Sequence, residues 1–144
     1  MNGTYLYCTN LINAACGPNV INMGGVDRYT SPPEGTYYGC YNLVKAVCGP
    51  KVKRMIGTYV YCENLKEAAC GDNVYYMDNT YYGCTSLTDA VCGNNVTDMN
   101  SVYVYCINLI NAACGPNVLY MNNTYQNCVN LINAVCGNNV TSMN

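Results

Sequence analysis

The sequence predicts a repeat solenoid: six right-handed coils of about 22 residues, each contributing one short parallel β-strand. Two observations lead to this fold class. Methionine recurs at a constant spacing, and the stretch NLINAACGPNV at 10–20 returns letter for letter at 108–118. A unit of this length is too short to bury its own apolar side, so it becomes stable only when each coil covers the next.

The methionines define the repeat boundaries. From Met55 to Met143 they follow one another at intervals of 22, and Met1 and Met23 keep the same interval. The step from Met23 to Met55 is 32, which is ten more. We therefore predict a single solenoid domain over 1–144 with an insertion at about 25–34 in the second repeat. The repeats run over 1–22, 23–54, 55–76, 77–98, 99–120 and 121–144.

Each repeat follows the pattern Met-x-x-Thr-Tyr-x-x-Cys-x-Asn-Leu-x-x-Ala-x-Cys-Gly-x-x-Val, with small departures. The segment Leu-x-x-Ala-x-Cys, for example Leu131–Cys136, is the expected strand. Six such strands would lie side by side in a parallel sheet, about 4.8 Å apart. The valine, tyrosine, methionine and first cysteine of each repeat are expected to fill the core from the return side of the coil.

The pattern resembles the BspA-like, or Treponema pallidum-type, leucine-rich repeat. Val96, Thr97 and Met99 occupy the place of that family's Ser-Val-Thr-x-Ile element, Thr80 and Tyr81 that of its Ala-Phe pair, and Cys84 and Leu87 that of its Cys and Asn-Leu. Here methionine replaces isoleucine, tyrosine replaces phenylalanine, and a second cysteine replaces an apolar strand residue. The resemblance implies a leucine-rich repeat fold and an association with surface and secreted proteins that adhere or bind partners. Similar arrays also occur in bacteriophage proteins.

Odd and even repeats differ in a regular way. Before the second cysteine, odd repeats have alanine and even repeats have valine, as in Ala15 and Val47. Before the first cysteine, odd repeats have tyrosine, whereas even repeats have glycine or asparagine, as in Tyr7 and Gly39. Two explanations stay open: duplication of a two-repeat unit, or a partner surface that repeats every two coils, about 10 Å.

The twelve cysteines form two columns with a spacing of C-x7-C and no C-x2-C pair. With no histidine in the chain, this spacing disfavours a zinc site. Equivalent cysteines of neighbouring coils are expected within the Cα distance of a disulfide, so pairwise bridges and buried reduced thiols remain alternatives. The first column is Cys8, Cys40, Cys62, Cys84, Cys106 and Cys128, and the second is Cys16, Cys48, Cys70, Cys92, Cys114 and Cys136.

The insertion reads GVDRYTSPPEG at 25–35, and its glycines, serine and paired prolines predict a loop. It is either a tolerated surface excursion or a docking loop. In the second case Asp27, Arg28, Tyr29 and Glu34 are the candidate contact residues.

Four asparagines begin an Asn-x-Thr sequence and are candidate glycosylation sites: Asn2, Asn95, Asn122 and Asn139. The alternative is that asparagines form turn caps and ladders along the stack. Paired tyrosines such as Tyr37-Tyr38 and Tyr75-Tyr76 are expected to have one member pointing outward, as a binding platform or as ordinary surface residues.

The composition narrows the classes of function. Histidine is absent, and no Lys, Arg, Asp or Glu follows Asp98, so we expect neither an enzyme nor a cofactor. The formal net charge of −2 disfavours nucleic acid as a partner. No stretch approaches the roughly 18 apolar residues of a membrane span.

Two functions remain. Neither end of the chain carries a charged or amphipathic cap, and Met143-Asn144 repeats the start of the unit. We expect either a piece of a longer array or head-to-tail stacking of copies, which would make an extracellular or virion-surface structural fibre. Lateral association of copies is also open. The alternative is an adhesin-like module that binds a host protein or glycan through its sheet face or the 25–35 loop.

Overall fold

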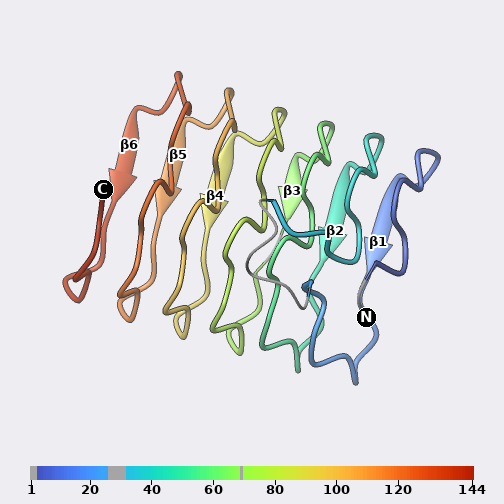
Figure 1. Ribbon diagram of the computed structural model, residues 1–144, viewed down its shortest axis with the longest axis horizontal. Helices are drawn as coiled ribbons and strands as arrows, with labels where there is room; N and C mark the ends of the chain where they lie inside the picture. Colours follow the sequence, from blue (N-terminus) through green and yellow to red (C-terminus); the bar gives the residue numbers. More distant parts are fainter. Residues whose placement is uncertain (1–2, 26–31, 69) are drawn as a thin grey trace.

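The structure is a computed structural model that describes residues 3–25, 32–68 and 70–144. The chain winds into six coils that lie side by side in one row, with the two termini at opposite ends of the row (Figure 1). We number these coils 1 to 6, with the boundaries of the six predicted repeats. The predicted solenoid is confirmed.

Each coil contributes one short strand, and neighbouring strands pair in parallel. They form two three-stranded sheets, β1-β2-β3 and β4-β5-β6. The strands are shorter than expected: β6 covers three residues rather than all of Leu131–Cys136. The Leu131 amide already donates to the Cys128 carbonyl in a turn, at 3.1 Å, and this turn limits the strand. The strands are β1 Asn13–Ala15, β2 Lys45–Val47, β3 Glu67–Ala68, β4 Asp89–Val91, β5 Asn111–Ala113 and β6 Asn133–Val135.

The return side of the coils carries a second, thinner parallel ladder. Single bridge residues follow one another from coil to coil: Asn22, Arg54, Tyr76, Asp98, Tyr120 and Ser142. Among the described residues there is no helix, and hence none long and apolar enough to cross a membrane. Turns connect the two ladders, and the whole coil is therefore built from extended and turn segments.

The core lies between the two ladders and is made of columns of identical residues. The leucine, first-column cysteine, valine, tyrosine and methionine of the interior coils are all buried, as the repeat pattern predicts. A buried threonine follows each methionine in most coils. The Thr80 hydroxyl donates to the Met77 carbonyl at 2.6 Å and to the Met55 carbonyl of the preceding coil at 2.8 Å. Coil 5 has Val102 at this place.

The alternation of odd and even coils at the residue before the first cysteine has an explanation inside the chain. The residue before the first-column cysteine has a positive φ in every coil, from 52° at Tyr7 to 72° at Gly83. A Cβ on Gly83 would lie 2.6 Å from Cδ1 of Tyr61 in the coil before it, and a Cβ on Gly39 would lie 2.5 Å from Cδ1 of Tyr7. The tyrosine of an odd coil thus fills the space left by the glycine of the next coil, and no partner is needed to account for this exchange of large and small residues.

The described flanks of the insertion pack against coil 3. The Gly25 amide donates to the Ile56 carbonyl at 2.9 Å, and the Gly35 amide donates to the Gly57 carbonyl at 3.1 Å. A Cβ on Gly24 would lie 2.5 Å from the Ile56 nitrogen. Glycine is needed here because the two backbones approach closely. The part of the predicted loop at 26–31 lies outside the described residues.

Candidate functional site

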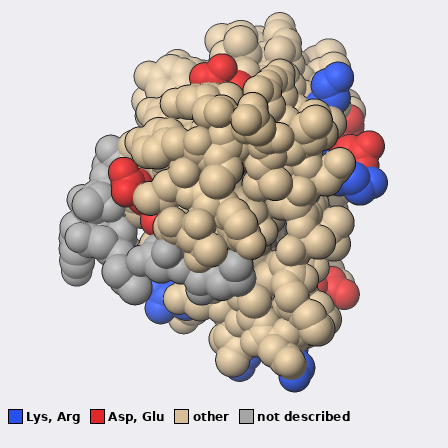
Figure 2. All heavy atoms as spheres, turned by 90° about the vertical axis from the view of Figure 1, so that its right-hand side faces the viewer, with Lys and Arg blue, Asp and Glu red and all other residues tan. Residues whose placement is uncertain are grey.

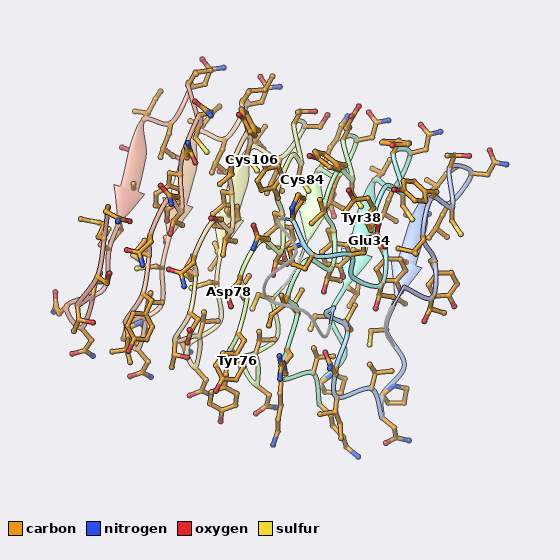
Figure 3. The ribbon with its side chains drawn as sticks, viewed as in Figure 1. Glu34, Tyr38, Tyr76, Asp78, Cys84 and Cys106 are labelled. Atoms are coloured by element: carbon orange, nitrogen blue, oxygen red, sulfur yellow. The ribbon has the colours of Figure 1, made fainter. Side chains whose placement is uncertain are left out.

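The first cysteine column ties each coil to the one before it. Each thiol from Cys40 to Cys128 points at the carbonyl of the inner tyrosine of the preceding coil, with sulfur–oxygen distances of 2.9 to 3.2 Å. This tyrosine is 25 residues earlier, except at Cys40, where the insertion makes the separation 35. Figure 3 labels two members, Cys84 and Cys106, at matching places of neighbouring coils. Both are fully buried, and burial raises the pKa of each thiol well above its usual range. These cysteines therefore act as small apolar side chains with a weak hydrogen-bond donor.

The second cysteine column lies beside the glycine column. The Gly115 amide donates to the sulfur of Cys92 and the Gly137 amide to that of Cys114, both at 2.8 Å. Burial raises the pKa of the Cys92 thiol to about 11. All twelve cysteines are free thiols in the structure. Among the described residues, no three Cys, Asp or Glu side chains come together to hold a metal ion.

Six tyrosines form an inner stack along the whole molecule: Tyr5, Tyr37, Tyr59, Tyr81, Tyr103 and Tyr125. Neighbouring ring centroids are 5.2 to 5.8 Å apart, with interplanar angles of 2° to 7°. The hydroxyls of Tyr59, Tyr81, Tyr103 and Tyr125 are buried and have no hydrogen-bond partner. Burial accordingly raises the pKa of these phenols.

A second row, the outer tyrosine ladder, lies on the surface: Tyr7, Tyr38, Tyr61, Tyr82 and Tyr105. Successive rings meet edge to face at 5.5 to 5.7 Å. Tyr37-Tyr38 and Tyr81-Tyr82 thus have one buried and one outer member, as expected. The prediction is wrong for Tyr75-Tyr76: both rings are exposed, because this pair lies at the return ladder, where Tyr76 is a bridge residue. Sequence reasoning did not foresee a continuous outer ladder, because its rings come from different positions in odd and even coils.

Asparagine side chains form ladders across the turns. Asn95 Nδ2 donates to the Asp72 carbonyl at 2.7 Å, and Asn139 Nδ2 donates to the Pro116 carbonyl at 2.8 Å. Asn122 Oδ1 accepts from the Ser142 hydroxyl at 2.8 Å. At Asn95 and Asn139 the nitrogen that a glycan would occupy is thus engaged in the fold. Asn2 lies outside the described residues, and glycosylation at all four sites stays a prediction.

The candidate docking loop is only partly described, because Asp27, Arg28 and Tyr29 lie outside the described residues. Glu34 is exposed and lies near Tyr38 (Figure 3). On the sheet face, Lys45 and Glu67 form an exposed ion pair of 2.7 Å, which also holds the pKa of the Glu67 carboxyl below its usual range through the Lys45 hydrogen bond.

Two of the hollows that the described residues form bear on function. A groove runs beside the strands between the asparagine ladder and the residues that precede each strand. It has a volume of about 470 Å³ over coils 3–6, where Ile110, Ile132 and Asn108 help to line it. The second hollow, about 480 Å³, is the open end of the core in coil 6, lined by residues such as Tyr125, Ala134 and Cys136.

The opposite end of the stack is the face of coil 1. Figure 2 looks onto this end: among the described residues in view, the charged side chains lie around its rim and not at its centre. Tyr5 and Leu11 are partly exposed here, although their equivalents in the interior coils are buried. The two end faces and the groove thus leave apolar surface open, as do outward-facing strand residues such as Val91 and Val135.

No family model and no curated protein matches the chain. Two solved structures are similar to it at 17% sequence identity. The crystal structure of a T. pallidum leucine-rich repeat protein has a TM-score of 0.82 and covers 99% of this chain. A leucine-rich cell surface protein from Faecalibacterium prausnitzii A2-165 has a TM-score of 0.70 and covers 92%. The chain spans 64% and 35% of those two chains, respectively. The fold is therefore that of the T. pallidum-type leucine-rich repeat, as the repeat pattern indicates.

Proposed function

We propose that this leucine-rich repeat chain is a non-enzymatic structural subunit that stacks end to end with copies of itself into an elongated assembly. One observation carries the proposal: the faces of coils 1 and 6 expose the same columns that every interior coil buries. The open face of coil 6 would accept coil 1 of a second copy.

The exposure of matching residues shows how much each open end leaves uncovered. Met121, at the start of coil 6, is 2% exposed, whereas Met143, which occupies the equivalent place one turn later at the open end, is 67% exposed. Ile110 in coil 5 is 39% exposed, and its equivalent Ile132 in coil 6 is 77% exposed. At the other end Tyr5 is 38% exposed, against 1% for Tyr59 in the interior. Covering this apolar surface is favourable by about 25 cal/mol for each Å² removed from water.

The chain contains its own template for such a junction. Coil 6 shares the stretch AVCGNNVT with coil 4, and coil 1 shares NLINAACGPNV with coil 5. The contact of coil 4 with coil 5 is therefore a close copy of the proposed contact of coil 6 with coil 1. There the Cys106 thiol lies 3.2 Å from the Tyr81 carbonyl, and the rings of Tyr81 and Tyr103 stack at 5.5 Å.

By analogy, the thiol of Cys8 in a second copy would point at the Tyr125 carbonyl, and the two end tyrosines would extend the inner stack. The odd–even order is preserved as well, because an even coil meets an odd one. Since the operation that adds one copy is a translation with a small twist, it does not close, and such contacts generate open filaments.

Charge does not oppose this contact. Coils 1 and 6 contain no Lys, Arg, Asp or Glu. Charged side chains and prolines on edge strands are the usual means by which proteins prevent edge-to-edge association. Neither β1 nor β6 contains such a residue.

A location at an extracellular or cell surface is part of the proposal. It is supported by the similar F. prausnitzii protein, which is a leucine-rich cell surface protein. The large uncharged area of coils 5 and 6 also suits a subunit that is covered in an assembly better than one that stays dispersed.

Two variants of β6 test the stacking. Ala134 belongs to the inward-facing column and lines the open end of coil 6, whereas Val135 faces outward from the sheet. Ala134→Lys would place an ammonium group in the junction, and we expect it to abolish assembly in sedimentation velocity. Val135→Lys is the matched control and should assemble like the parent. Circular dichroism verifies that both fold. Equal assembly of both variants would contradict the proposal.

The second candidate is a binding module, and the groove beside the strands favours it. One wall offers amide groups such as Asn108, and the other offers aliphatic side chains such as Ile110. Such a surface suits a host protein or glycan with both hydroxyl groups and apolar faces. This candidate predicts separate rods that capture a ligand, with Ile110→Asp abolishing capture and leaving the folded rod intact.

A further inference from the structure

We propose that Cys114 and Cys136 form a redox-sensitive disulfide site, at which a small disulfide oxidant such as oxidised glutathione links the last coil to the coil before it. The inference concerns a single chain and does not depend on the stacking proposed above. It selects one pair out of the two cysteine columns.

The register of the sheet places these two residues side by side. Strands β5 and β6 pair with Ala113 opposite Val135, so the cysteines that follow are neighbours across the ladder. The Cys114 amide donates to the Val135 carbonyl at 3.0 Å. Equivalent Cα atoms of adjacent strands lie about 4.8 Å apart, inside the 4.4–6.8 Å range of disulfides.

Cys136 is the one exposed cysteine of the twelve, whereas both members of the pair at the other end of the same column, Cys16 and Cys48, are partly buried. Cys136 is exposed and Cys114 is half-buried, whereas Cys62, Cys84 and Cys106 of the first column are fully buried. The first-column thiols are also directed at backbone carbonyls, and a disulfide there would remove those contacts. An oxidant in solution therefore reaches Cys136 before it reaches the interior of either column.

Coil 6 also has the freedom that a disulfide requires. Bonded cysteines need Cβ atoms about 3.8 Å apart, which is closer than the spacing of neighbouring strands. An interior coil is held on both sides, so such a movement would disturb two interfaces. Among the described residues coil 6 packs on coil 5 alone, and its open side leaves room for a small displacement.

The reaction consists of two thiol–disulfide exchanges. The Cys136 thiolate attacks one sulfur of oxidised glutathione, and the other half leaves as a glutathione thiolate. The Cys114 thiolate then attacks the Cys136 sulfur of the mixed disulfide and displaces the second glutathione. Two protein thiols become one cystine, and one oxidised glutathione becomes two reduced ones. Burial raises the pKa of the Cys114 thiol, and the Gly137 amide, 2.8 Å from its sulfur, offsets part of this effect by stabilising the attacking thiolate.

The test follows disulfide formation in the folded chain, at a concentration where sedimentation shows single chains. The protein is treated with oxidised glutathione, quenched with an alkylating reagent and analysed by intact mass and chymotryptic mapping. We expect the first product to have lost two thiols and to contain the Cys114–Cys136 crosslink. Cys136→Ser and Cys114→Ser should each slow the appearance of the first disulfide between two protein cysteines at least about tenfold, and Cys114→Ser should keep glutathione on Cys136. Cys128→Ser, in the same coil but the first column, is the matched control and should react like the parent.

Three results would overturn the inference: a first disulfide between other cysteines, an unchanged rate in Cys136→Ser, or a glutathione that stays on Cys136 of the parent chain. A disulfide-linked dimer through Cys136 would also contradict it, because the partner would then be another chain. Cys136 is exposed, so its replacement by serine is expected to leave the fold intact, and circular dichroism verifies this in each variant.

Discussion

Gly83→Ala tests whether the fit between odd and even coils holds the stack together. The new Cβ would lie 2.6 Å from Cδ1 of Tyr61, and the backbone at this position has a φ of +72°. A left-handed conformation costs an alanine about 1–2 kcal/mol, and forcing a methyl group into a filled space costs about 1–3 kcal/mol. We expect a loss of about 2–4 kcal/mol in the free energy of unfolding, since the half-exposed Tyr61 ring gives way in part.

Urea unfolding followed by circular dichroism measures this loss. The matched control is Gly17→Ala, because a Cβ there meets only the Val20 side chain, at 3.8 Å, and we expect a change within about 0.5 kcal/mol. A double-mutant cycle with Tyr61→Gly separates the cost of the contact between the new methyl group and the Tyr61 ring from the cost of the left-handed backbone conformation. In the Tyr61→Gly background, Gly83→Ala should cost only the backbone part, about 1–2 kcal/mol. An equal cost in both backgrounds would refute the fit between the tyrosine and the glycine.

Three further predictions concern single features of the coil. Val102→Thr should stabilise the chain by about 0.5–1.5 kcal/mol in urea unfolding, because the new hydroxyl can donate to the Met99 carbonyl, as Thr80 and Thr124 donate to Met77 and Met121. No gain in stability would show that these threonine hydrogen bonds add nothing. Glu67→Gln should change stability by less than about 1 kcal/mol, since its ion pair with Lys45 is exposed. The free energy of unfolding should fall as the pH rises from about 9 through about 12. Burial raises the pKa of the Cys92 thiol to about 11 and that of the Tyr37 phenol to about 12. In this pH range the unfolded chain therefore releases protons that the folded chain still holds. A flat pH profile over that range would contradict the burial of these groups.

Most of the fold follows from the repeat pattern. A leucine, two cysteines and a methionine at fixed spacing predict one coil, and a unit that short has few alternatives to stacking. The expected strand was too long, because pattern alone does not show where a turn bond such as that from Leu131 to Cys128 replaces a ladder bond. The glycines of the insertion predict a loop, yet Gly35 is also needed for close backbone approach to coil 3, where a Cβ would lie 2.5 Å from the Gly57 oxygen.

The candidate sites were less predictable than the fold. The outer tyrosine stands one residue before the first cysteine in odd coils and two residues before it in even coils. Only the left-handed backbone conformation of the residue before the first cysteine explains why the rings of Tyr38 and Tyr61 meet. The cysteine columns were evident, but their difference in environment was not. A thiol directed at a carbonyl, as in Cys84, and one beside a glycine amide, as in Cys92, look alike in a spacing pattern.

The measurement that tests the central claim most directly is electron microscopy of the purified chain, with a power spectrum of any filaments. Six coils at about 4.8 Å each predict an axial repeat near 29 Å, with the strand spacing along the filament axis. Filaments with that repeat, absent in Ala134→Lys and present in Val135→Lys, are the predicted result. Separate rods about 29 Å long in both variants and in the parent chain would contradict end-to-end stacking.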